Sequence, residues 1–259
     1  MLRFRSLGSG SAGNGTVVEA GSGAAARRLL IDCGFGPRQL AQRLARAGLA
    51  CDDLDGIFIT HEHSDHVGCA VALAQQHAIA IWMSPGTYAA IGNPPLGTLL
   101  HLVQDGETID LGPLEARPFT VPHDAREPLQ LRCSDGQHHL GVATDFGHAS
   151  AHLLAQLAGC HALLLEANHD PELLAQSAYP PFLKRRVGGD WGHLSNEAAG
   201  AILTTLAHPG LARVVAAHLS ERNNRPELVR ERFACSLGWE QDAIVIAHQH
   251  SGTEWIPVG

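Results

Sequence analysis

A histidine-rich stretch decides how this chain is interpreted: residues 60–66 read Thr60-His61-Glu62-His63-Ser64-Asp65-His66. It follows the apolar residues 56–59 and precedes a helix-like sequence. In an extended or tightly turning segment, alternate side chains point the same way. We therefore expect His61, His63 and Asp65 to converge on one point, while His66 enters the first turn of the helix.

This stretch favours a metal site over a structural role. Imidazoles and a carboxylate do not build an apolar core, and imidazoles that lie close together repel one another when protonated. A metal ion removes both objections, because it binds neutral imidazoles and offsets the carboxylate charge. The alternative is a polar surface loop, but the position of the stretch at the end of an apolar strand favours the metal.

The composition indicates a packed globular protein. Of the 259 residues, 45% are hydrophobic and 17% are charged, which excludes a disordered chain. No run approaches the length of about 20 apolar residues that spans a bilayer, so we expect no membrane segment. The net charge of −8 argues against wholesale wrapping of nucleic acid but leaves room for a local basic groove.

The cysteines and the N-terminal sequence predict a cytoplasmic protein. The 6 cysteines are far apart and form no C-x-x-C pair, so neither a disulfide framework nor a thiolate zinc site is expected. The first residues, MLRFRSLGSG, contain no apolar core of signal-peptide length.

Strand-like and helix-like segments predict sheets inside and helices outside. Short apolar runs bounded by turn residues predict strands, among them Arg28–Asp32 and Arg213–His218. Helix-like runs such as His66–Gln76 and Asn196–Leu206 alternate with strands later in the chain. No linker divides the sequence, so we expect one domain over residues 1–259.

The pattern H-x-H-x-D-H after a strand resembles the signature of the metallo-β-lactamase fold. The resemblance implies an α/β (α+β) fold, a four-layer αββα sandwich with a metal site on loops at one edge of the sheets. It also implies further ligands near later strand ends, and the sequence has His123 in VPHDA, Asp145 in GVATDFGH and His218 in AAHLS. Taken singly, these three could be a loop histidine, a turn cap and a core histidine.

By this resemblance two divalent metal ions share the site. His61, His63 and His123 are expected to hold one ion. Asp65, His66 and His218 are expected to hold the other, with Asp145 bridging the two. Histidine with carboxylate and no thiolate suits Zn²⁺, our default, and also Mn²⁺ or Fe²⁺.

Longer stretches narrow the resemblance to one branch of that fold. LGSGSAGNGTVVEAG, LLIDCGFGPRQL, PHDAREP, LLLEANHD, GHLSNEAA and AAHLSERNN look like the YycJ/WalJ-like branch, whose wider relatives include ribonuclease Z and phosphodiesterases. This branch implies exonuclease activity on duplex DNA from a 5′ end. Glu166 and His193 resemble a catalytic glutamate and histidine of ribonuclease Z, although Leu165 replaces the histidine expected before the glutamate.

These residues predict a hydrolytic mechanism. A pair of metal ions lowers the pKa of water and neutralises phosphoryl charge, and Asp65 is expected to orient or deprotonate the attacking water. His193 is our candidate for the general acid that protonates the departing alkoxide, with Glu166 as its partner. The alternative for His193 is a structural contact at the start of the helix predicted over Asn196–Leu206.

The sequence says less about the substrate. Lys184, Arg185 and Arg186 form a tight basic cluster that could meet backbone phosphates, and Arg126 could reach a substrate anion. The cluster could equally be a solvated cationic turn.

Two other functions remain open at this point. One is hydrolysis of a small substrate such as a cyclic phosphodiester, thioester, ester or lactam, because this fold supports many reactions. The other is a noncatalytic regulatory protein that binds metal for structure.

Overall fold

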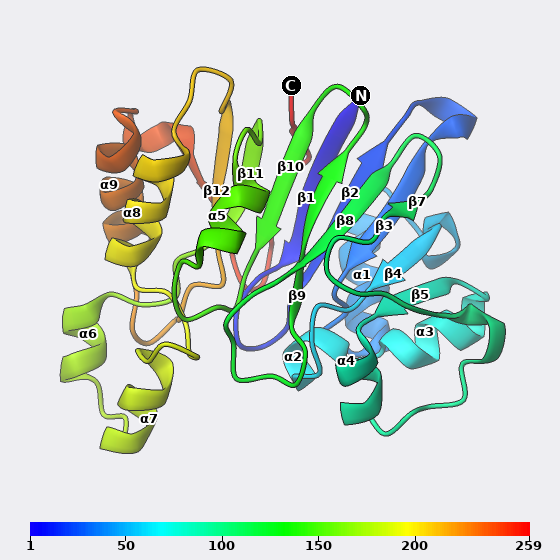
Figure 1. Cartoon of the computed structure of the whole chain (residues 1–259), viewed down its shortest axis with the longest axis horizontal. Coiled ribbons are helices and arrows are strands. Elements are labelled where there is room, and N and C mark those ends of the chain that lie inside the picture. The colour runs from blue at the N-terminus through cyan, green and yellow to red at the C-terminus, as the bar shows by residue number, and fades with distance from the viewer.

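Two mixed β-sheets of seven strands each form the centre of the structure, a computed structural model that describes residues 1–259 (Figure 1). The first sheet has the strand order β14-β1-β2-β3-β4-β5-β6 and the second β13-β12-β11-β10-β9-β8-β7. The strands of the first sheet are β1 (Leu2–Gly8), β2 (Gly15–Ala20), β3 (Arg27–Ile31), β4 (Gly56–Phe58), β5 (Ala80–Met83), β6 (Leu100–Leu102) and β14 (Ile256–Pro257). Those of the second are β7 (Ile109–Asp110), β8 (Glu115–Thr120), β9 (Leu129–Ser134), β10 (His139–Ala143), β11 (Ala162–Glu166), β12 (Arg213–Ala217) and β13 (Ile244–Ile246).

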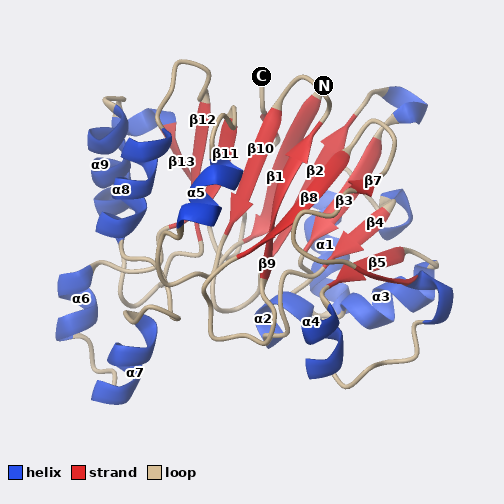
Figure 2. Ribbon diagram, in the orientation of Figure 1, coloured by secondary structure: helices blue, strands red, loops and turns tan.

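Helices cover the outer face of each sheet, which gives four layers (Figure 2). Neighbouring strand residues alternate between the layers. Val18 is buried between the sheets, whereas Val17 packs toward the helices on the other face. The first sheet is covered by α1 (Pro37–Arg46), α3 (Ala70–His77) and α4 (Pro85–Ala90), and the second by α5 (Ala151–Leu157), α8 (Asn196–Leu206) and α9 (Pro226–Leu237).

The remaining short helices lie near the lower edge of the sheets in Figure 1. They are α2 (Ser64–Val67), α6 (Pro171–Gln176) and α7 (Pro181–Val187). Strands β3 and β4 are parallel, as are β10, β11 and β12. Their carboxyl ends therefore gather at this edge, and the loops that follow them can meet.

The four-layer αββα sandwich predicted from the sequence is confirmed, but several of the predicted element boundaries were wrong. The helix expected over His66–Gln76 is two helices, interrupted at Gly68. That glycine has a φ of +38°, and a Cβ there would lie 2.2 Å from the Cys33 carbonyl oxygen. The edge strands β6, β7 and β14 and the helix α7 were not predicted. None of the helices combines the length and the apolar character that a membrane crossing needs.

Candidate metal centre

The loops at the carboxyl edge enclose a polar pocket of about 330 Å³. Its lining comes from positions far apart in the sequence: Ser11, His63, Ser64, Asp65, Asp145, Arg186, His193 and His218. The structure thus brings together residues from the loops of both sheets, from α2 and from α7.

Three buried polar residues at strand ends have an unusual backbone conformation with positive φ. Asp32 follows β3 and His218 follows β12, and both have left-handed backbone, with φ of +59° and +54°. Asp145, just beyond β10, has a φ of +57°. Non-glycine residues in this region carry strain of about 1–3 kcal/mol each and cluster at functional sites. The strands predicted over Arg28–Asp32 and Arg213–His218 end one residue early for this reason.

His61, His63 and His123 place three ring nitrogens around one point. The Nδ1 atom of His63 lies 3.0 Å from His61 Nε2 and 3.3 Å from His123 Nε2. Ligands placed tetrahedrally at about 2.0–2.1 Å from a zinc ion stand about 3.3 Å apart. The spacing therefore fits a shared ion.

The other ring nitrogens of these histidines have partners that fix the rings. His61 Nδ1 lies 3.0 Å from Thr60 Oγ1, which in turn donates to the Asp32 carboxylate. His123 Nδ1 donates to the Gly192 carbonyl oxygen at 3.1 Å. Such outer hydrogen bonds are characteristic of metal-ligating histidines, because they set the tautomer that leaves the other nitrogen free.

A second donor group surrounds Asp145. Its Oδ2 lies 2.6 Å from His66 Nε2, and its Oδ1 contacts His218 Nδ1. Asp65 Oδ2 lies 3.5 Å from His66 Nε2 and 3.8 Å from His218 Nε2. Yet both Asp145 oxygens and His218 Nδ1 are buried without a hydrogen bond. Acceptor atoms crowded toward one another in this way fit a cation between them.

Burial and neighbouring charges set the protonation of these groups. Burial lowers the pKa of His61 and of His123, which favours the neutral imidazoles that bind metal. For Asp145, burial acts to raise the pKa, but His218 and His66 outweigh it and the pKa is lowered well below the ordinary value. This carboxylate is therefore ionised although it is buried.

His193 and Glu166 form a pair at the wall of the same pocket. Glu166 is completely buried, and its Oε2 accepts the Phe146 N–H at 2.9 Å. His193 Nδ1 lies 2.7 Å from Glu166 Oε1 and 3.1 Å from Asp145 Oδ1. Burial acts to lower the pKa of His193, but the two carboxylates prevail and raise it. The second ring nitrogen, Nε2, is left without a carboxylate partner.

The basic residues singled out in the sequence separate in space. Arg186 lines the pocket and donates from Nε to Asp124 Oδ2 at 2.7 Å. Lys184 and Arg185 belong to α7 but do not line the pocket, and Lys184 donates to the Ala175 carbonyl oxygen. Arg126 is exposed and also lies outside the lining.

Sequence reasoning gave no role to Asp32, Thr60 or Asn14. Asp32 Oδ2 lies 2.7 Å from His66 Nδ1, so Asp32 supports two of the proposed ligands. Asn14 Nδ2 donates to Asp65 Oδ2 at 3.2 Å. The signals were present, since Asp32 ends an apolar strand and Asn14 lies in the glycine-rich turn between β1 and β2.

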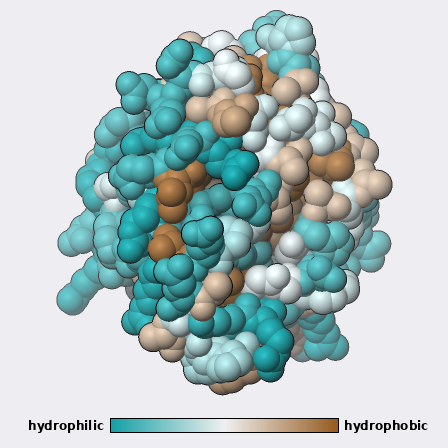
Figure 3. Space-filling model, turned by 90° about the vertical axis from the view of Figure 1, so that its left-hand side faces the viewer, coloured by the Kyte–Doolittle hydropathy of each residue, from teal (hydrophilic) through white to brown (hydrophobic).

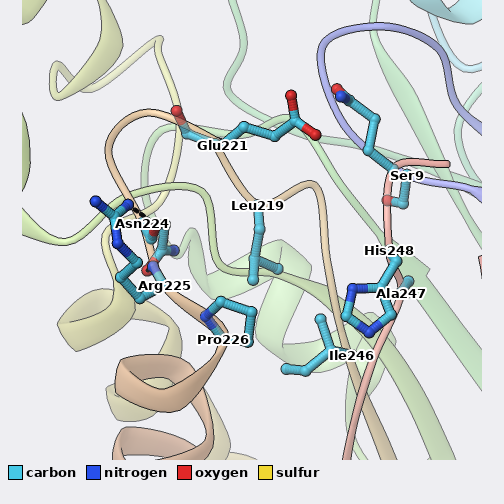
Figure 4. A pocket seen from close by; sticks show the side chains of 11 residues that line it. Ser9, Leu219, Glu221, Asn224, Arg225, Pro226, Ile246, Ala247 and His248 are labelled. Atoms are coloured by element: carbon cyan, nitrogen blue, oxygen red, sulfur yellow. Dashed lines mark hydrogen bonds between the residues drawn. The ribbon is translucent and has the colours of Figure 1, made fainter.

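A larger cavity of about 420 Å³ adjoins the metal centre behind His218. Ser9 accepts the His218 N–H at 2.8 Å and also lines this cavity, as does the next residue, Leu219. Figure 4 shows Leu219, Pro226 and Ile246 toward its floor, with Arg225 and His248 on opposite sides. The cavity is thus separated from the metal centre by little more than one loop.

Known proteins resemble this chain along most of its length. Residues 27–219 match the beta-lactamase superfamily domain. Exodeoxyribonuclease YycJ of Bacillus anthracis is 33% identical over 233 residues, which are 88% of this chain and 86% of that protein. Exodeoxyribonuclease WalJ of Streptococcus pneumoniae serotype 2 is also 33% identical over 233 residues, 88% of this chain and 85% of WalJ.

Solved structures share the fold at lower identity. The metallo-beta-lactamase fold protein YhfI from Bacillus subtilis has a TM-score of 0.74 and 18% identity, with 98% of both chains covered. Zn²⁺-bound PqqB from Methylobacterium extorquens also gives 0.74, at 17% identity, covering 98% of this chain and 99% of that one. The chain therefore belongs to the beta-lactamase superfamily, as a metallo-hydrolase of the branch that contains YycJ and WalJ.

Proposed function

We propose that this enzyme hydrolyses phosphodiester bonds in nucleic acid, and that it acts on duplex DNA as a 5′ exonuclease in the cytoplasm. The observation that carries the proposal is the joint placement of two donor groups at one pocket, which Asp145 and His193 also line; Asp145 lies within ligand-sharing distance of His61, His66 and His218. The names of the relatives YycJ and WalJ support DNA as the substrate.

The proposed ligand assignment follows the two donor groups. His61, His63 and His123 would hold one divalent ion. Asp65, His66 and His218 would hold a second, with Asp145 between them. When bound, such a pair of ions supplies Lewis acidity toward the phosphoryl group and lowers the pKa of water. Zn²⁺ is our default, and Mn²⁺ or Fe²⁺ would suit the same ligands.

Side chains of this enzyme would supply the remaining steps. Asp65 lies at the pocket wall and is held by Asn14, so it can orient the attacking water. His193 donates a hydrogen bond from Nδ1–H to Glu166, and its other nitrogen, Nε2, can then protonate the departing alkoxide. A general acid of this kind contributes about 10²–10⁴-fold.

A substrate panel tests the proposal. The metal-loaded protein would be assayed on 5′-labelled duplex DNA, single-stranded DNA, RNA, a cyclic nucleotide, a thioester and a β-lactam. We expect release of nucleotides from the 5′ end of DNA, and loss of that activity in His61→Ala, which excludes a contaminating nuclease. Intact DNA, together with turnover of another member of the panel, would contradict the proposal.

The large cavity supports a second candidate, hydrolysis of a small phosphodiester. A volume of about 420 Å³ is within the usual range for small-molecule sites, and two residues of its lining, Ser9 and Leu219, bond to or directly follow His218. Faster turnover of the cyclic nucleotide than of DNA would favour this candidate. The noncatalytic alternative is set aside because the chain belongs to a family of hydrolases.

A further inference from the structure

Two aromatic side chains stand in solvent on segments that also supply Arg186 and His193 to the metal pocket. Phe182 in α7 and Trp191, two residues before His193, are 66% and 61% exposed. Only two other large hydrophobic residues, Met1 and Leu102, are exposed in the whole molecule. The face that carries α6–α9 is otherwise mostly hydrophilic, with isolated apolar residues (Figure 3).

The backbone around Trp191 is fixed to the metal loops. The Trp191 carbonyl oxygen accepts the Asp124 N–H at 2.9 Å, and the next carbonyl, of Gly192, accepts from His123. A Cβ at Gly192 would lie 2.1 Å from the Arg186 carbonyl oxygen, so only glycine allows this approach to α7. The backbone at Trp191 is therefore held in place by a carbonyl contact next to the one that orients His123.

Cationic groups accompany these aromatic rings. Arg186 lines the metal pocket and pairs with Asp124, whereas Arg185, one residue earlier on α7, is exposed and makes no ion pair, so its charge is free to meet a phosphate. A backbone-neutralising cation next to an exposed ring is the combination that proteins use to hold single-stranded nucleic acid. The charge and the continuity with the pocket favour nucleic acid over an apolar partner.

We propose that Trp191 and Phe182 form a stacking site for unpaired nucleobases next to the scissile phosphate, while Arg185 and Arg186 hold the backbone. The inference rests on the proposed nuclease function and narrows its substrate to ends with unpaired nucleotides. Bases within a duplex are stacked on one another and cannot reach the two rings. Duplex DNA with a single-stranded or frayed end is then preferred to a blunt, stable end.

The test compares Trp191→Ala, Phe182→Ala and Trp191→Phe on two substrates. One is duplex DNA with an unpaired 5′ end, and the other is bis(4-nitrophenyl) phosphate, which has no base. Each lost stacking contact corresponds to about 5- to 150-fold in binding. We expect the alanine variants to lose kcat/KM on DNA by about that factor more than on the small diester, mainly through KM. Trp191→Phe should recover most of the loss.

Leu102→Ala is the matched control, because Leu102 is exposed on β6, in the other sheet. It should leave both activities unchanged. Equal losses of Trp191→Ala on the two substrates, or equal kcat/KM of wild type on frayed and blunt ends, would overturn the stacking site. If wild type cleaves the small diester but no nucleic acid, it is the proposed nuclease function that fails.

Discussion

The loops that carry the proposed metal ligands and the segment around α7 meet at one pocket, but they differ in how deeply their side chains are buried. His61, His66 and His123 are almost completely buried, and hydrogen bonds fix their outer nitrogens. The segment from Pro181 to Trp191 exposes aromatic and cationic side chains to solvent. The difference separates two tasks, since a rigid buried site suits the chemistry and an exposed surface suits the choice of substrate.

The largest expected effect comes from removing a buried carboxylate of the metal centre. Asp145→Ala removes the carboxylate that we propose bridges the two ions, so bound metal and hydrolysis should fall together, and by more than the about 10- to 100-fold that loss of an outer partner costs. Metal analysis and turnover of bis(4-nitrophenyl) phosphate measure the two losses. Glu240→Ala, at an exposed carboxylate, is the control. A variant that keeps two ions per chain would contradict the proposed bridging role of Asp145.

His193→Ala tests the wall of the pocket without removing a proposed ligand. We expect a loss of about 10²–10⁴-fold on DNA, whose alkoxide needs a proton. The loss on bis(4-nitrophenyl) phosphate should be far smaller, because its phenolate leaves without help. The test measures kcat on DNA and on bis(4-nitrophenyl) phosphate for wild type and variant, with the same amount of metal bound to each. Equal losses would assign His193 a structural role.

Asp32→Asn tests how much the buried histidine ligands depend on the hydrogen bonds that orient their rings. The amide keeps the shape of the side chain but removes the charge that faces His66 Nδ1 and Thr60. Loss of such an outer partner costs about 10- to 100-fold in metal affinity or activity. Competition with a chelator measures the affinity, and Asp110→Asn on β7 is the control. Unchanged affinity would show that Thr60 alone orients the rings.

The last prediction concerns the pH dependence of folding stability, with no change in activity at pH 7, and involves His169, which pairs with Ser195 through an isolated β-bridge. Burial lowers the pKa of His169 to about 4, whereas an unfolded histidine titrates near 6.5. The unfolded chain therefore binds more protons between these values, and wild type loses up to about 3 kcal/mol as the pH falls through them. His169→Gln should lack this loss. Denaturant unfolding of both proteins at pH 7, 5.5 and 4.5 measures the free energy of unfolding. If that free energy changes with pH equally in wild type and His169→Gln, the lowered pKa of His169 is refuted.

The sequence predicted the fold because the chemistry-bearing residues are local or follow apolar strands. Residues 60–66 gave four of the seven proposed ligands directly, and the other three, His123, Asp145 and His218, each follow a strand. What the sequence could not reveal arises from contacts between distant segments. Gly68 breaks a helix because a carbonyl oxygen at position 33 lies too close for a side chain.

Helix α7 escaped prediction for a related reason. Its seven residues, PFLKRRV, bury no side chain fully, so no apolar periodicity marks them. Its place is set by the close approach of Gly192 to its last turn. The sequence therefore left two interpretations of Lys184, Arg185 and Arg186 open, a phosphate-binding cluster and a solvated cationic turn. The exposed Phe182 and Trp191 gave no signal until their positions were known.

Anomalous diffraction from crystals of the metal-loaded enzyme tests the central claim most directly. The account predicts two ions in the pocket, one within bonding distance of His61, His63 and His123 and the other of Asp65, His66 and His218, with Asp145 reaching both. An empty pocket in fully loaded protein, or ions bound by other side chains, would contradict it.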